Sequence, residues 1–263
     1  MRSRKVGFIG LGEMGKGMAS NLARGFDLTV FDILPEPVEE LKKLGARAAR
    51  SPAALAETCD YVITMARNTA QTNDIIFGKD GLWGELKDGS VLLITSTIDP
   101  QFVREVSKKA APKGIKVLDA PVSGGARGAK GGTLTIMVGG EETTFKECQP
   151  LFEAIGKSLF YIGGIGCGLA AKLANNAVWY MNRFALKEGL RLGSEAGVDS
   201  DKLLEMIKVS SGGSTVASAW EILRNNPMKN IDKDISLALD LAKSTGVKLP
   251  VLGLTSQLPV REQ

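Results

Sequence analysis

A chain of 263 residues, with 44% hydrophobic and 24% charged side chains, has the composition of a globular protein of one large or two modest domains. The formal net charge of +4 comes without any block rich in Lys and Arg, so no nucleic-acid partner is indicated. No apolar run reaches the roughly 18 residues of a membrane span, and Glu13 and Lys16 interrupt the stretch that a signal peptide would need. We therefore expect a soluble protein with no membrane partner.

The cysteine and histidine counts narrow the chemistry further. The cysteines Cys59, Cys148 and Cys167 are scattered and lack CxxC spacing, which fits a reducing cytoplasm and indicates neither a metal site nor a disulfide framework. The chain has no histidine. Proton transfer near neutral pH must then use Lys, Asp, Glu, Tyr or Cys.

Short apolar runs alternate with amphipathic ones over the first 160 or so residues, which predicts a doubly wound α/β domain with a parallel sheet. The predicted strands are residues 5–10, 28–32, 61–66, 90–95, 115–122, 133–140 and 159–164. The predicted helices are residues 14–24, 37–44, 53–57 and 102–111.

The pattern changes at about Gly163, after which we predict helices only. A long helical stretch follows, with Gly197 as its stop, and further helices are expected at 199–209, 218–223 and 236–244. The sequence thus predicts an α/β domain over residues 1–163 and an all-helical domain over 164–263, joined by a long helix.

Three glycines, Gly10, Gly12 and Gly15, have GxGxxG spacing between the first predicted strand and helix. In a Rossmann domain the first allows the tight turn, the second lets the backbone approach a pyrophosphate, and the third lets helix and strand pack closely. The spacing alone is weak, because glycine-rich turns often serve only packing. Asp32, however, ends the second strand about 20 residues on, where a carboxylate accepts from ribose hydroxyls. The combination predicts a dinucleotide-binding Rossmann domain.

Asp32 also bears on which dinucleotide binds. Its carboxylate would repel a 2′-phosphate, and no Arg follows it in DILPEP, so NAD is expected and NADP is less favoured. The structural alternative for Asp32 is a helix N-cap or turn residue.

Lys172, near the start of the long helix, is our candidate for acid/base chemistry. Its apolar neighbours would disfavour the charged form, and Asn176 lies four residues on, on the same helix face. The structural alternative is a surface lysine whose stem covers apolar groups. The adjacent amides Asn175 and Asn176 argue against it, because such residues are poor helix formers and suggest a polar function.

Residues 119–134, DAPVSGGARGAKGGTL, predict a strand running into a glycine-rich loop. Ser123, Gly124 and Gly125 there offer a hydroxyl and bare backbone N–H groups, which suit a carboxylate. A flexible surface loop is the alternative.

Four segments in this order resemble the β-hydroxyacid dehydrogenase family, which includes 3-hydroxyisobutyrate dehydrogenase and tartronate semialdehyde reductase. They are GFIGLGEMG (7–15), STIDP (96–100), DAPVSGG (119–125) and GLAAKLANN (168–176). The resemblance implies a homodimeric or homotetrameric oxidoreductase that transfers a hydride between NAD(H) and a small 3-hydroxy acid or its semialdehyde. In two respects the chain departs from the family: residues 220–233 form a shorter stretch, and the sequence ends at QLPVREQ without the usual final helix.

The resemblance also implies roles for individual residues. Lys172 would donate and accept the proton, Asn176 would assist at the substrate, and Ser123, Gly124 and Gly125 would bind the substrate carboxylate. Lys233, in a Lys–Asp pair with Asp234, would reach the cofactor. The full set expected at the cofactor is Gly10, Leu11, Gly12, Glu13, Met14, Gly15, Asp32, Met65, Ala66, Arg67, Asn68, Thr97 and Lys233.

Other dehydrogenase families fit the sequence less well. A 6-phosphogluconate dehydrogenase would carry a histidine at Asn175, imine reductases generally lack this lysine, and a short-chain dehydrogenase needs a Tyr-x-x-x-Lys pair that no tyrosine here provides. A non-enzymatic NAD-binding or interaction protein of the same fold would be expected to lose Lys172, but the short C-terminal region keeps this alternative open. The substrate stays open: Ser211–Ser214 and Trp220 are candidates for its pocket wall, with a Gly/Ser turn and a core indole as structural alternatives.

Overall fold

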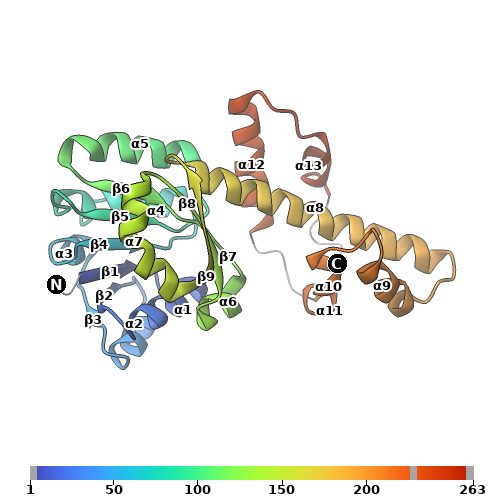
Figure 1. The fold of residues 1–263 in the computed structure, drawn as a ribbon, viewed down its shortest axis with the longest axis horizontal. Coiled ribbons are helices and arrows are strands. Elements are labelled where there is room, and N and C mark those ends of the chain that lie inside the picture. The colour runs from blue at the N-terminus through green and yellow to red at the C-terminus, as the bar shows by residue number, and fades with distance from the viewer. Residues whose placement is uncertain (1–4, 226–229, 259–263) are drawn as a thin grey trace. The chain divides into compact units, whose positions relative to one another are not determined.

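The computed structural model describes residues 5–225 and 230–258, which form two compact units (Figure 1). The first unit ends at Lys172 and the second begins at Leu173, so the division falls inside one helix, α8 (Cys167–Glu195). Because α8 contributes to both units, the domain boundary that we placed between residues 163 and 164 stays a prediction. In the described part of the chain, no helix combines the length and hydrophobicity that crossing a bilayer requires.

One sheet forms the centre of the first unit. Its strands are β1 (Lys5–Ile9), β2 (Asp27–Phe31), β3 (Arg47–Ala48), β4 (Tyr61–Thr64), β5 (Val91–Ile94), β6 (Lys116–Asp119), β7 (Val122–Ser123), β8 (Leu134–Gly139) and β9 (Gly156–Gly163). The strand order is β3-β2-β1-β4-β5-β6-β8-β7, and β9 pairs with β8. All pairings from β3 to β6 are parallel, whereas β8 runs antiparallel to β6 and β7.

Both faces of the parallel sheet are buried, as the apolar runs predict. Neighbouring residues of β1 point to opposite faces: Phe8 packs in a core with Met18 of α1, and Ile9 packs in a second core with Leu55 of α3. The first core also takes side chains from α2, α6 and α7, and the second from α4 and α5. The doubly wound α/β prediction is therefore confirmed.

The single strand predicted at 115–122 is interrupted. Residues of β6 and β7 follow one antiparallel register along β8, but Pro121 breaks the strand between them because it has no N–H to donate. Its carbonyl still accepts a hydrogen bond from Met137 N–H at 3.1 Å. We did not predict β3, which has only two residues, both exposed.

Seven α-helices connect these strands within the described residues. They are α1 (Glu13–Leu22), α2 (Pro35–Lys42), α3 (Pro52–Ala56), α4 (Thr69–Phe77), α5 (Pro100–Ala110), α6 (Gly125–Gly131) and α7 (Glu142–Ile155). We did not predict α4, α6 or α7. In α7 an internal Pro150 obscures the pattern, and α6 is so rich in glycine that its sequence resembles a loop.

The second unit is helical, and no described residue beyond Gly163 belongs to a strand, as predicted. After α8 come α9 (Ser200–Val209), α10 (Thr215–Ser218), α11 (Trp220–Leu223), α12 (Ile231–Thr245) and α13 (Pro250–Thr255). The helix predicted at 218–223 is divided into α10 and α11, the helix predicted at 236–244 begins earlier, and α13 was not expected. Part of the shortened stretch 220–233 (residues 226–229) and most of the terminal QLPVREQ lie outside the described residues.

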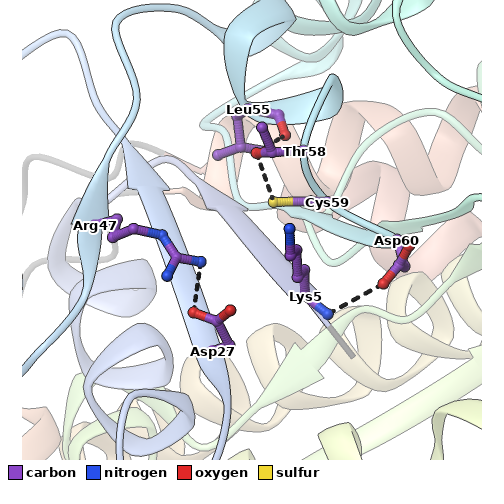
Figure 2. A network of polar contacts seen from close by, with 7 residues as sticks. All are labelled: Lys5, Asp27, Arg47, Leu55, Thr58, Cys59 and Asp60. Carbon is purple, nitrogen blue, oxygen red and sulfur yellow. Dashed lines mark hydrogen bonds and ion pairs between the residues drawn. The ribbon is translucent and has the colours of Figure 1, made fainter. Parts of the chain in front are cut away.

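Polar contacts tie together the N-terminal ends of the parallel strands (Figure 2). Lys5 N–H, at the start of β1, donates to Asp60 Oδ2 at 3.2 Å, and Arg47 of β3 pairs with Asp27 of β2 at 2.5 Å. Cys59 lies beside them, and burial raises the pKa of its thiol, so it behaves as a core group. These contacts join neighbouring strands at this end of the sheet, whereas the predicted cofactor loops of the first unit follow the opposite strand ends.

Candidate active site

The glycine loop after β1 has the geometry that each glycine was predicted to serve. Gly10 has a φ of +93°, and a Cβ there would lie 2.2 Å from the Met65 carbonyl oxygen. A Cβ on Gly15 would lie 1.8 Å from the Gly10 carbonyl oxygen, so only glycine lets α1 approach β1 this closely. A Cβ on Gly12 would meet nothing within 4 Å. Open space at the middle glycine, between two tightly packed ones, fits a loop that a pyrophosphate approaches.

The N-terminus of α1 follows this loop directly. Gly12 is its N-cap, and the first helical hydrogen bond runs from Lys16 N–H to the Gly12 carbonyl at 2.9 Å. The N–H groups of Glu13 and Met14 precede that bond, so the helix itself does not use them. Such groups favour an anion at the helix N-terminus.

Asp32, directly after β2, contacts the same loop. Its Oδ2 accepts from Leu11 N–H at 2.5 Å, and its Oδ1 accepts from Leu34 N–H at 2.8 Å. The bond from Leu34 N–H is the turn contact that the structural alternative for Asp32 predicts. The bond from Leu11 N–H holds the carboxylate beside the glycine loop. Each oxygen has a further lone pair, so a ribose contact stays a prediction.

The loops after β4 and β5 form the neighbouring part of the same edge. Met65 N–H donates to the Ile9 carbonyl at 2.8 Å, and Ala66 N–H donates to Ser96 Oγ at 2.7 Å. Asn68 caps α4, its Oδ1 accepting from Gln71 N–H at 2.9 Å. Ser96, which sequence reasoning did not single out, thus links the predicted cofactor segment 65–68 to the loop that carries Thr97.

These loops meet where the strand order reverses. The chain places β2 on one side of β1 and β4 on the other, so the C-terminal ends of these strands form a topological switch point. In open α/β sheets, ligands bind outside the carboxyl ends of the strands at this point. Within the first unit, the structure brings the predicted cofactor residues of four loops to one edge.

Residues 125–131 form helix α6 and not a glycine-rich loop, which corrects the prediction for residues 119–134. Ser123 ends β7 and pairs with Thr135 of β8, while Gly124 and Gly125 have φ values of +128° and +63° and lead into α6. The first helical bond of α6 joins Gly128 N–H to the Gly124 carbonyl at 3.1 Å. The preceding N–H groups are therefore not used by the helix.

Helix α6 is held against α1. A Cβ on Gly17 of α1 would lie 2.8 Å from the Ala129 backbone, and Asn21 Nδ2 donates to the Ala129 carbonyl at 2.8 Å. A glycine and an amide in the middle of α1 are the sequence signals that could have revealed this contact. Helix α1, which follows the predicted cofactor loop, therefore packs against helix α6, which follows the residues predicted to bind the carboxylate.

Lys172 lies on α8, one turn beyond its start, and is only 8% exposed. That burial contradicts the surface-lysine alternative. The start of α8 is bound by Asp119, the last residue of β6. Its Oδ1 accepts from the N–H of Gly166, directly before α8, at 2.6 Å, and its Oδ2 accepts from the N–H of Leu169 in the first turn at 2.7 Å. Burial raises the pKa of the Asp119 carboxyl, and these two hydrogen bonds oppose the rise.

Asn176, one turn beyond Lys172, belongs to a polar cluster in the second unit. Its Nδ2 donates to Asp234 Oδ2 of α12 at 2.8 Å, and Tyr180 O–H donates to the same oxygen at 3.0 Å. Lys233 Nζ lies 3.0 Å from Asp234 Oδ1. Burial, and next the Asp234 charge, raise the pKa of Tyr180. Asp234 thus joins Asn176 to Lys233, and Tyr180, which we had not selected, completes the cluster.

The remaining sequence candidates have structural explanations. Asn175 is exposed, Ser214 is the N-cap of α10 and accepts from Ala217 N–H at 3.1 Å, and Trp220 packs against the buried cluster of Leu186 and Leu204. No group of three or more His, Cys, Asp or Glu side chains in the described residues is arranged to hold a metal.

Comparisons with known proteins agree with this geometry. A family model described as the NAD binding domain of 6-phosphogluconate dehydrogenase matches residues 5–163. A second, described as NAD-binding of NADP-dependent 3-hydroxyisobutyrate dehydrogenase, matches residues 166–261. Together they account for both halves of the chain.

Individual proteins give the same result. The chain is 36% identical to mitochondrial 3-hydroxyisobutyrate dehydrogenase of Mus musculus, an alignment covering 94% of this chain and 78% of that protein. It is 35% identical to NAD-dependent L-serine dehydrogenase of Pseudomonas aeruginosa, covering 97% and 91%. The solved structure of Mycobacterium tuberculosis 3-hydroxyisobutyrate dehydrogenase with L-serine has a TM-score of 0.84 at 29% identity, covering 96% of this chain and 91% of that chain. The chain therefore belongs to the β-hydroxyacid dehydrogenase family and is an NAD-dependent enzyme that transfers a hydride between the dinucleotide and a small hydroxy acid.

Proposed function

We propose that this dehydrogenase acts on a small 3-hydroxy acid or its semialdehyde and uses Lys172 as the general acid and base. The observation that carries the proposal is the burial of Lys172 one turn inside α8, whose start is hydrogen bonded to Asp119 at the carboxyl end of β6. In a chain without histidine, a buried lysine is a suitable proton carrier.

The substrate class follows from what the relatives share. 3-Hydroxyisobutyrate and L-serine, named in their descriptions, each have one carboxylate and a hydroxyl on the β-carbon. Ser123, Gly124 and Gly125 suit that carboxylate, since they offer a hydroxyl and N–H groups before the first helical bond of α6. Both compounds are therefore the first substrates to test.

The proton chemistry is assigned to Lys172. When bound, NAD(H) supplies the hydride acceptor or donor. As a neutral amine, Lys172 accepts the proton of the substrate hydroxyl while the carbon loses its hydride. In the reverse direction its ammonium returns the proton to the carbonyl oxygen. Asn176 is proposed to hold the substrate oxygen near the amine.

The cofactor residues fit a dinucleotide. Open space at Gly12 and the free first turn of α1 suit the pyrophosphate, and Asp32, held beside the loop, suits the ribose hydroxyls. A carboxylate there favours NAD over NADP. Thr97, Lys233 and the segment Met65–Asn68 are proposed to contact the remainder of the cofactor. We also propose a homodimer or homotetramer in the cytoplasm.

Replacing Lys172 tests this proposal. Lys172→Ala is expected to lower kcat by about 10²–10⁴-fold, the usual contribution of a positioned acid or base, with little change in NAD affinity. The rate is followed by the near-ultraviolet absorbance of NADH with L-serine and 3-hydroxyisobutyrate, and NAD affinity by calorimetry. Lys187→Ala, an exposed lysine on the same helix, is the control and should retain wild-type kcat. Equal kcat for Lys172→Ala and wild type would contradict the assignment. A wild-type protein that binds NAD but oxidises no acid would favour the non-enzymatic alternative.

A further inference from the structure

The buried carboxylate of Asp119 has no part in the proton transfer described above. It ends β6 and is 0% exposed. Burying a carboxylate is unfavourable unless its oxygens are hydrogen bonded. Both oxygens of Asp119 are hydrogen bonded, one to the N–H of Gly166, directly before α8, and the other to the N–H of Leu169 in its first turn.

This capping differs from that of other helices in the protein. In α3, α4, α5, α9 and α10, the side chain of the helix's own N-cap residue accepts the hydrogen bond. Such a local cap satisfies an N–H group at the helix N-terminus but does not determine where the helix lies. The carboxylate that binds α8 comes from a strand of the central sheet, so it fixes the start of α8 relative to that sheet.

The backbone around Asp119 is closely packed at two glycines. A Cβ on Gly139 of β8 would lie 2.5 Å from Asp119 Oδ1, and a Cβ on Gly168 of α8 would lie 2.4 Å from the Met137 carbonyl oxygen. Both glycines allow strand and helix to come close enough for the carboxylate to reach the helix N–H groups. A negative charge at a helix N-terminus is also favoured by the helix dipole.

We propose that Asp119 is a positioning residue for Lys172: by holding the first turn of α8 on the sheet, it sets where the lysine amine lies. The inference rests on the proposed acid/base role of Lys172. Lys172 follows Leu169 by three residues, about 4.5 Å along the helix axis, so a displacement of the first turn moves the lysine with it. A misplacement of about 1 Å can lower a rate by about 100-fold.

A double-mutant cycle tests the proposal. Asp119→Ala is expected to lower kcat by about 10- to 100-fold in the wild-type background and by less than about twofold in the Lys172→Ala background, where no amine remains to be positioned. NAD affinity, measured by calorimetry, should change little. Asp119→Asn, which keeps one side-chain oxygen as an acceptor, should recover most of the lost kcat. Asp199→Ala, which removes an exposed cap in the second unit, is the control and should retain wild-type kcat.

Hydrogen exchange in the cofactor-free protein gives a readout independent of activity. Amides of residues 164–172 should exchange faster in Asp119→Ala than in wild type, while those of residues 200–209 should not change. If Asp119→Ala does not fold, the same cycle with Asp119→Asn applies, with a smaller loss of kcat that again disappears in the Lys172→Ala background.

The outcomes separate the two proposals. An equal loss of kcat in both backgrounds, or unchanged exchange over residues 164–172, overturns the positioning role while leaving Lys172 as the acid/base. Wild-type kcat in Lys172→Ala alone contradicts the proposed function itself, and the positioning role with it.

Discussion

A single substitution can separate the structural contact of Asp32 from its proposed role at the cofactor. Its carboxylate accepts from Leu11 N–H, which shapes the glycine loop, and its charge is proposed to exclude a 2′-phosphate. Asn at this position keeps an acceptor oxygen and removes the charge.

We expect Asp32→Asn to raise kcat/KM for NADP relative to NAD by about tenfold or more, because the repulsion between two nearby negative charges is removed. The measurement compares initial rates with the two cofactors at a fixed substrate concentration. Asp60→Asn, at the opposite strand ends, serves as a control. A ratio unchanged from wild type would mean that Asp32 does not face the adenosine ribose.

Asp119 makes stability depend on pH in a defined direction. Its pKa is raised by burial, so the folded state binds its proton more tightly than the unfolded chain does. The stabilisation from this difference is present below the ordinary aspartate pKa of about 4 and is lost as the pH rises through the raised pKa of the folded protein.

The wild type should therefore lose stability relative to Asp119→Asn as the pH rises from about 4 towards neutral. Denaturant unfolding of the two proteins across this range measures the difference. A difference of the opposite slope would show that the hydrogen bonds from Gly166 and Leu169, which lower the pKa, outweigh burial.

At the scale of elements, the turn from β1 to α1 contains two glycines that close packing requires and one glycine with open space beside it. Gly10 and Gly15 have no room for a Cβ, whereas Gly12 has. Packing and cofactor binding should therefore respond to different substitutions in the same loop.

Gly12→Ala is expected to weaken NAD binding by about tenfold or more, equivalent to about 1.4 kcal/mol, because its methyl group occupies the space proposed for the pyrophosphate. Its thermal unfolding should stay close to that of wild type. Gly15→Ala should instead unfold at a lower temperature, since its Cβ would overlap the Gly10 carbonyl. Unchanged NAD affinity in Gly12→Ala, measured by calorimetry, would place the pyrophosphate elsewhere.

Elements differed in how far the sequence could predict them. The buried strands were predictable because runs such as VLLI in β5 are apolar on both faces. Helix α6 was not, because Gly125, Gly128 and Gly131 are typical of a loop and the helix depends on contacts with Gly17 and Asn21 of α1. Tertiary packing outweighed local propensity there.

The same reasoning applies to the candidate site. The glycine loop and Asp32 were predictable because local spacing defines them. Asp119 accepts from α8, and Asp234 accepts from Asn176 and Tyr180. These bonds join residues far apart in the sequence, and no local pattern marks them. For the same reason, only the structure could show that Lys172 is buried.

At the scale of the whole molecule, the helical unit exposes large apolar side chains. Leu192 is 74% exposed, Ile222 65% and Leu254 64%. Exposed apolar groups of this size are typical of surfaces that a partner covers when they form a contiguous patch.

We expect the protein to be a homodimer or homotetramer. Size-exclusion chromatography with light scattering measures its mass directly against the 27.9 kDa of one chain. Ile222→Glu should shift the equilibrium towards the monomer if Ile222 lies in the interface, whereas Ile33→Glu, an exposed residue of the first unit, should not. A monomer at all concentrations would contradict the expectation.

The most direct test of the assignment of Lys172 is a crystal structure of the protein with NADH and a non-reacting 3-hydroxy acid analogue. The account predicts that the lysine Nζ lies within about 3.2 Å of the reacting oxygen, with the analogue's carboxylate at Ser123 and Gly125. An amine that instead points into solvent, with the reacting oxygen bound by another side chain, would contradict it.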